Sequence, residues 1–244
     1  MSGPKPSWNH ADAQHYEAAH GLRWIRERGQ PLMERLRNLS ADDRSPTHAV
    51  IMREFFEDDV RVWDQFADHI AGRAVLDVGC GPIPFASFLV WAAPRIAIDP
   101  LIEAYDREAR RVFDGQSAFD GLRCYAQKAE IFIEELAGAI DGAIICRNAL
   151  DHLEFPAIVL SNLASYAASG CRLLLWSDII HLNGGDSGHY NIAPNEASLE
   201  RLVRNLGFEV TRIVPPWPNR PTISWGCLAI KVSSDAGRAG RERP

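Results

Sequence analysis

"AVLDVGCGPIPF", residues 74–85, is the stretch of sequence that decides the fold. An apolar run ends in Asp77 and passes into a turn in which Gly79 and Gly81 flank a cysteine. A short apolar run bounded by glycines predicts a buried strand. Glycines in the turn that follows let the backbone take positive φ angles and approach a ligand closely. The stretch therefore predicts a first strand whose carboxyl end borders a binding site.

The prolines of this turn narrow the kind of ligand. Pro82 and Pro84 each remove a backbone N–H that a phosphate would need. Pro84 also stands where the dinucleotide fingerprint GxGxxG requires its third glycine. A pyrophosphate ligand, and with it a nicotinamide-dependent oxidoreductase, is therefore disfavoured.

Outward from this turn, short apolar runs alternate with longer amphipathic segments as far as residue 232. The pattern predicts strands at 74–79, 95–99, 122–126, 141–148, 171–178, 208–214 and 224–232, and helices at 84–93, 101–113, 129–137, 155–168 and 194–206. Strands that are apolar on both faces and alternate with helices are typical of a parallel sheet covered on both sides. We expect an α/β, doubly wound, mostly parallel seven-stranded sheet with an antiparallel edge, because no helix separates the last two strands.

Three regions are expected in all. Residues 1–71 form an N-terminal helical extension, helical over 10–70 with a break at 38–46, and residues 72–232 form the α/β domain. Residues 233–244 read as a disordered tail. The extension carries aromatic and histidine side chains. They favour the hypothesis that it covers a binding pocket as a lid, and the alternatives are that they pack in the core or form a homodimer interface.

Composition excludes several classes of protein. The 244 residues carry a net charge of -6, which disfavours a general nucleic-acid binder. The five cysteines are widely spaced and form no CxxC pair, which favours reduced thiols over disulfides or a zinc site. We find no apolar run long enough to span a membrane and no secretory leader, so a cytoplasmic location is expected.

A second carboxylate narrows the chemical class of the ligand. The segment "RIAIDP" ends its strand in Asp99, and a carboxylate there can accept hydrogen bonds from both hydroxyls of a ribose. Asp77, before the glycines, would repel a pyrophosphate but attract a cationic group. A positively charged nucleoside without phosphate fits both positions, and S-adenosylmethionine is such a molecule.

At this point residues 72–232 resemble the class I, Rossmann-like S-adenosylmethionine-dependent methyltransferases. "VLDVGCGP" resembles the first motif of that family, "AQKAE" (126–130) its adenine-contacting segment, and "IICRNALDHLEFP" (144–156) its fourth motif. The sequence departs from the family at Ile83, where many members have a third glycine. The resemblance implies S-adenosylmethionine as cofactor, bound by Asp77, Gly79, Gly81, Asp99, Ala129, Glu130 and Asn148.

The loop after the fourth strand supplies candidates for chemistry. His152 is the first candidate for a general base, and Asp151 for its orienting partner or a substrate contact. Alternatively, Asp151 caps the next helix and His152 only packs. In the long polar segment 177–194, His181, His189 and Tyr190 are candidates for the acceptor pocket, unless the segment is a flexible exposed loop. No tight ligand spacing supports a metal, so none is expected.

These features predict an enzyme that transfers a methyl group to an oxygen or nitrogen of a small-molecule or sugar-like acceptor. Residues "NALD" stand where enzymes that methylate an exocyclic base amine or a glutamine amide carry an NPPY-type tetrapeptide, which argues against those acceptors. A non-catalytic S-adenosylmethionine-binding scaffold is one alternative. The other is an RNA methyltransferase whose partner supplies a basic surface.

Overall fold

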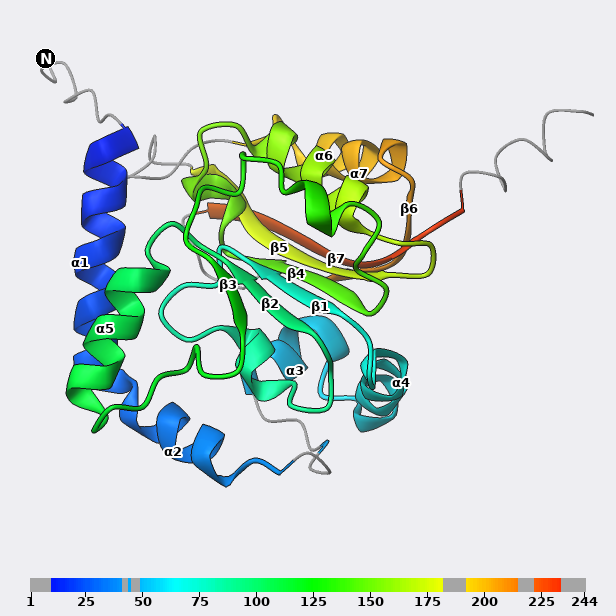
Figure 1. The fold of residues 1–244 in the computed structure, drawn as a ribbon. Coiled ribbons are helices and arrows are strands. Elements are labelled where there is room, and N and C mark those ends of the chain that lie inside the picture. Colours follow the sequence, from blue (N-terminus) through cyan, green and yellow to red (C-terminus); the bar gives the residue numbers. More distant parts are fainter. Residues whose placement is uncertain (1–9, 41–43, 45–48, 182–191, 215–221, 234–244) are drawn as a thin grey trace, which may run out of the picture.

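The computed structural model describes residues 10–40, 44, 49–181, 192–214 and 222–233. Its centre is a seven-stranded sheet with the order β3-β2-β1-β4-β5-β7-β6 (Figure 1). The strands are β1 (Val75–Val78), β2 (Arg95–Ile98), β3 (Arg123–Tyr125), β4 (Ala143–Arg147), β5 (Arg172–His181), β6 (Phe208–Val214) and β7 (Thr222–Lys231).

The sheet confirms the expected mixed topology. β1, β2, β3, β4 and β5 pair in parallel, whereas β7 runs antiparallel to both of its neighbours, β5 and β6. The expected antiparallel pair thus forms one edge of the sheet, with β6 outermost. The strand order turns back at β1 and β4, and this switch point is where ligands bind in open α/β sheets.

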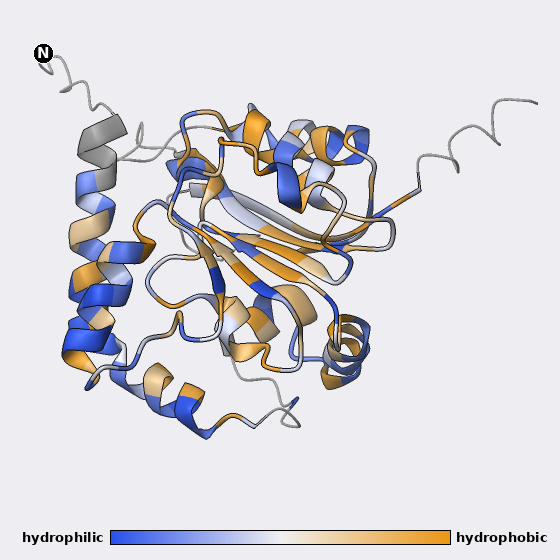
Figure 2. Ribbon diagram, in the orientation of Figure 1, coloured by the Kyte–Doolittle hydropathy of each residue, from blue (hydrophilic) through white to orange (hydrophobic). Residues whose placement is uncertain are grey.

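Helices cover both faces of the sheet (Figure 1). α6 (Pro156–Tyr166) and α7 (Glu196–Asn205) lie on one face, and α3 (Ala49–Phe56) and α4 (Val60–Ile70) lie on the other. α1 (His10–Arg28), α2 (Gln30–Asn38) and α5 (Ile102–Val112) enclose a third apolar cluster beside β2. Figure 2 shows apolar strands between helices whose outer faces are hydrophilic.

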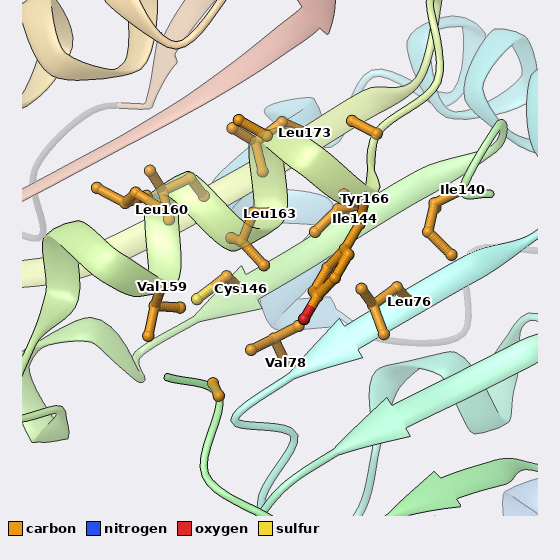
Figure 3. Close-up of a cluster of buried hydrophobic side chains, with 14 of the residues drawn as sticks. Leu76, Val78, Ile140, Ile144, Cys146, Val159, Leu160, Leu163, Tyr166 and Leu173 are labelled. Carbon is orange, nitrogen blue, oxygen red and sulfur yellow. The ribbon is translucent and has the colours of Figure 1, made fainter. Parts of the chain in front are cut away.

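Side chains of successive strand residues point to opposite faces, and this alternation decides the face to which Asp77 points. Leu76 and Val78 pack with Leu163 and Tyr166 of α6 (Figure 3). Val75 belongs to the cluster on the opposite face. Asp77 shares the parity of Val75 and therefore points away from α6.

Two expected helices in the α/β domain are wrong. Segment 84–93 contains only the short 3-10 helix η1 (Phe85–Phe88), and 129–137 contains only η2 (Glu134–Leu136). Residues 85–89 are buried on every side, so apolar spacing there reflects a buried connection rather than one face of a helix. The carboxylate of Asp77 also accepts the N–H of Ala86, which holds this backbone in a turn.

The extension is also more divided than predicted. Segment 47–70 was expected to be one helix, but the chain breaks between α3 and α4, where Glu57 and Asp58 have positive φ angles of 48° and 58°. The carboxylate of Asp59 then accepts the N–H of Arg61 and caps α4. The domain boundary near residue 71 stays a prediction, and residues 234–244 of the expected tail lie outside the described residues.

Candidate functional site

The glycine turn after β1 is closed by contacts that only glycine permits. Gly79 has a φ of 63° and its N–H donates to the carbonyl of Ile98 at 2.8 Å. A Cβ atom at Gly79 would lie 2.4 Å from the Cβ of Ala149. Gly81 has the same φ, but a Cβ atom there would meet nothing within 4 Å. Close packing therefore explains Gly79, and backbone conformation alone explains Gly81.

Asp77 stabilises the segment that follows this turn. Its side chain is 3% exposed, and its carboxylate accepts the N–H of Ala86 at 3.1 Å. Burial raises the pKa of Asp77 to about 7, although hydrogen bonds from the backbone of Ala86 and Phe85 lower it. Asp77 does not line the cavity described below, so its predicted contact with the ligand stays a prediction.

Asp99, by contrast, joins the turn after β1 to the turn after β2, beside the switch point. One carboxylate oxygen accepts the N–H of Gly81 at 3.1 Å, and the other accepts the N–H of Leu101 at 2.8 Å. The residue is 8% exposed, and burial raises the pKa of its carboxyl group. Each oxygen keeps a further lone pair for a ligand.

A cavity of about 620 Å³ opens beside these turns. It collects residues from the carboxyl ends of β1, β2 and β4, from the segment after β3 and from α1. Of the predicted site residues, the cavity is lined by Gly79, Gly81, Asp99, Ala129, Glu130, Asn148 and His152. The structure thus brings together side chains that lie far apart in the sequence.

The segment after β3 is held by a residue that the sequence analysis missed. Asn162 of α6 is buried, and its amide donates to the carbonyls of Ala129 at 2.9 Å and Glu130 at 3.2 Å. Both carboxylate oxygens of Glu130 are buried, and no described residue forms a hydrogen bond with them. An amide in the apolar helix sequence "PAIVLSNLASY" was the available signal for Asn162.

The end of β4 is anchored to the N-terminal extension. Arg147 donates two hydrogen bonds to the carboxylate of Glu54 on α3, at 2.6 and 2.9 Å, and Glu54 is only 3% exposed. The guanidinium also lies 5.7 Å from the ring centre of Trp176. Asn148 follows with a φ of 52° and donates its N–H to the carbonyl of Trp176 at 2.7 Å. A glutamate inside the apolar run "IMREFF" was the sequence signal for this ion pair.

Asp151 and His152 lie in the 3-10 helix η3 (Leu150–His152) and have different surroundings. The carboxylate of Asp151 is fully buried and accepts the hydroxyl of Ser177 at 2.8 Å. His152 lines the cavity, with its Nε2 4.0 Å from Asp151 Oδ1 and its Nδ1 3.5 Å from Glu17 Oε1 of α1. The 4.0 Å between Nε2 of His152 and Oδ1 of Asp151 is longer than a hydrogen bond, so the orienting role of Asp151 stays a prediction. The contact with Glu17 was not foreseen.

The other acceptor candidates lie beyond what the structure describes. His181 ends β5 but its side chain is not described, and His189 and Tyr190 fall in 182–191, outside the described residues. Among the residues described, no group of three or more His, Cys, Asp or Glu side chains is arranged to hold a metal ion. No helix of the described part is long and apolar enough to cross a membrane.

Comparison with known proteins rests on structure alone. No protein-family model matches the sequence, and no curated protein matches it. A solved structure from Bacillus halodurans C-125, provisionally described as a methyltransferase, superposes with a TM-score of 0.52 at 16% identity, covering 72% of this chain and 100% of its own. An S-adenosylmethionine-dependent methyltransferase from Mesorhizobium loti gives 0.50 at 14% identity, covering 71% and 99%.

The chain has the class I methyltransferase fold. This confirms the resemblance stated from the sequence at the level of fold. A 16S rRNA (adenine(1408)-N(1))-methyltransferase from Catenulisporales acidiphilia superposes at a TM-score of 0.48 and 18% identity, covering 72% of this chain and 93% of its own. A class I methyltransferase fold does not by itself specify an acceptor, which has to be argued from the site.

Proposed function

We propose that the protein is an S-adenosylmethionine-dependent methyltransferase that acts on an oxygen or nitrogen of a small-molecule or sugar-like acceptor. The observation that carries this proposal is the hydrogen bond between Asp99 and Gly81, which both line the cavity. It joins an acidic strand end to a glycine turn at the switch point, which is the arrangement that binds a nucleoside in open α/β folds.

The residues that would hold S-adenosylmethionine fit its chemistry. Asp99 keeps acceptor capacity for ribose hydroxyls, and the buried carboxylate of Glu130 has no hydrogen-bond partner among the described residues. Gly79 and Gly81 let the backbone come close to the ligand. When bound, the molecule supplies a methyl group on a cationic sulfur, whose departure as a neutral thioether needs no acid.

His152 is the residue proposed to handle the proton of the acceptor. It lines the cavity, and a neutral imidazole has a ring nitrogen that can accept a proton, as a general base must. Asp151, held by the hydroxyl of Ser177, would favour one orientation of the imidazole through its negative charge, 4.0 Å from Nε2. The main contribution of the site would be positioning, because in-line attack requires the acceptor atom behind the methyl group at about 3 Å.

The net charge of -6 favours a small molecule over a nucleic acid, which would meet an acidic protein. The polar residues around His152 favour an enzyme over a scaffold. A cytoplasmic location and a homodimer stay predictions from the sequence.

Calorimetric titration with S-adenosylmethionine and with its demethylated product tests the cofactor. We expect micromolar binding that Asp99→Ala abolishes and Asp64→Ala, at an exposed position on α4, leaves unchanged. A folded protein that binds neither compound would end the proposal. Binding without turnover of any acceptor would instead favour the scaffold.

A further inference from the structure

One wall of the cavity contains none of the residues proposed to bind the cofactor. It is formed by α1, which contributes Tyr16, Glu17, His20, Gly21 and Trp24. α1 and α5 lie side by side (Figure 1). α1 packs closely against Tyr105 of α5, because a Cβ atom at Gly21 would lie 2.4 Å from the Tyr105 ring. The Tyr105 hydroxyl also donates a hydrogen bond to the carbonyl of Glu17 at 3.4 Å. The side chains of this wall therefore have defined positions relative to the switch point.

The charges that line the cavity favour a cation. Among the described lining residues, Glu17, Asp99 and Glu130 carry carboxylates, and Lys128 and Arg147 carry the cationic groups. Arg147 is already neutralised by the two hydrogen bonds to Glu54, which does not line the cavity. Carboxylates are thus in excess on the inner surface.

Glu17 is the carboxylate nearest to the proposed base. Its Oε1 lies 3.5 Å from Nδ1 of His152, whereas Asp151 faces the other ring nitrogen at 4.0 Å. Asp99 is close enough for its charge to interact with both Glu17 and His152. Glu17 therefore lies where α1 meets the 3-10 helix η3, on a different element from the residues proposed to hold the nucleoside.

Aromatic side chains lie on the same wall. Tyr16 directly precedes Glu17 and Trp24 follows it by two helical turns, and both line the cavity; the buried Tyr105 lines it from α5. Aromatic faces attract ammonium groups, and this attraction adds to that of a nearby carboxylate. An ammonium group would interact with both the carboxylate and the aromatic faces of this wall.

We propose that the acceptor is a small amine whose ammonium group binds against Glu17, so that the methyl group is transferred to nitrogen. The inference rests on the proposed function and narrows its acceptor. The ammonium loses one proton to His152, and the freed lone pair forms the nitrogen–carbon bond. The sulfur–carbon bond breaks with its electron pair on sulfur, and the positive charge moves from sulfur to the methylated nitrogen, beside Glu17.

The test uses the full chain with S-adenosylmethionine and matched acceptors. Primary and secondary amines are each compared with the isosteric alcohol and carboxylate, for example phenethylamine, 2-phenylethanol and phenylacetate, and the demethylated product is quantified. We expect turnover of amines only. Glu17→Gln should raise the KM for the amine by about tenfold to a hundredfold, because a charged hydrogen bond is lost. The matched control is Glu27→Gln, an exposed position on the same helix.

Cofactor affinity separates the two proposals. In Glu17→Gln, the dissociation constant for S-adenosylmethionine should stay unchanged, and Glu17→Asp should restore part of the amine KM. The amine assignment is overturned if alcohols react as well as amines, if Glu17→Gln leaves the KM unchanged, or if no amine reacts while the cofactor binds. Loss of cofactor binding in the unmodified protein would instead overturn the proposed function.

Discussion

The cavity has two walls that are built in different ways. The strand wall, at the ends of β1, β2 and β4, is fixed by backbone hydrogen bonds, by Gly79 against Ala149 and by the buried carboxylates Asp77 and Asp99. The helix wall presents side chains of α1, such as Glu17 and Tyr16, which are partly exposed. The strand wall is therefore rigid because of the fold, and the helix wall depends on how α1 is docked.

The difference separates two kinds of contribution to function. Residues of the strand wall affect stability and binding together, because the same hydrogen bonds close the turns and shape the site. Residues of the helix wall can change acceptor binding without disturbing the sheet. Substitutions in the two walls should accordingly give different ratios of lost stability to lost activity.

The largest effect is expected at the ion pair that joins the N-terminal extension to the end of β4. Replacing Glu54 with Leu leaves Arg147 charged without its buried partner, and we expect a loss of about 4 kcal/mol in the free energy of unfolding. Urea denaturation measures it. A double variant, Glu54→Leu with Arg147→Met, should recover part of the loss. If the single variant is as stable as the wild type, the ion pair does not stabilise the packing of the extension on the α/β domain.

In the strand wall, the two glycines give a matched pair. Gly79→Ala would combine a positive φ with a 2.4 Å contact, and we expect it to cost about 3 kcal/mol. Gly81→Ala carries only the strain of its φ of 63° and should cost about 1 kcal/mol. Chemical denaturation gives both values. Equal costs would show that the contact with Ala149 is not what requires glycine.

The raised pKa of Asp77 predicts how the free energy of unfolding depends on pH. Its pKa is raised in the folded protein to about 7, so the folded state binds the proton more tightly than the unfolded chain. This contribution to stability is complete at low pH and is lost as the pH rises, by about 2.5 kcal/mol between about pH 5 and about pH 8. Thermal or urea unfolding at both values measures it. Asp77→Asn should remove this part of the pH dependence, and an unchanged profile would contradict the assignment.

A small effect, similar to that of Gly81→Ala, is expected in the helix wall. Gly21→Ala favours the helix by about 1 kcal/mol but meets the Tyr105 ring at 2.4 Å, so we expect a net loss of about 1 kcal/mol. Hydrogen exchange should rise in the amides of α1 and stay unchanged in β1 and β4. A uniform rise along the chain would mean that the helix wall is not independent.

Most of the strand wall could be predicted because its signals are local. Asp77, Gly79, Gly81 and Asp99 follow predicted strands, and parallel strands bring their carboxyl ends to one edge. The strand bounds differ from the predicted ones by a few residues. What local patterns missed was burial, which turned the expected helix at 84–93 into a short buried turn.

Other features depend on contacts between distant residues. Asn162 reaches the carbonyls of Ala129 and Glu130 across more than thirty positions, and Glu54 reaches Arg147 across ninety-three. A single sequence shows such residues only as a polar letter in an apolar run, without its partner. Asp151 and His152 were predicted as a pair, but their separation into one buried and one cavity-lining side chain needed the three-dimensional fold.

The close packing of Gly21 against Tyr105 has an evolutionary consequence. A helix attached through a small residue leaves its other cavity-lining positions free to vary, whereas Gly79 in the turn after β1 cannot carry a Cβ atom without meeting Ala149. Divergence in a protein built this way would accumulate in acceptor choice while the nucleoside pocket stays constant. Descendants of one ancestor could then share a cofactor and differ in what they modify.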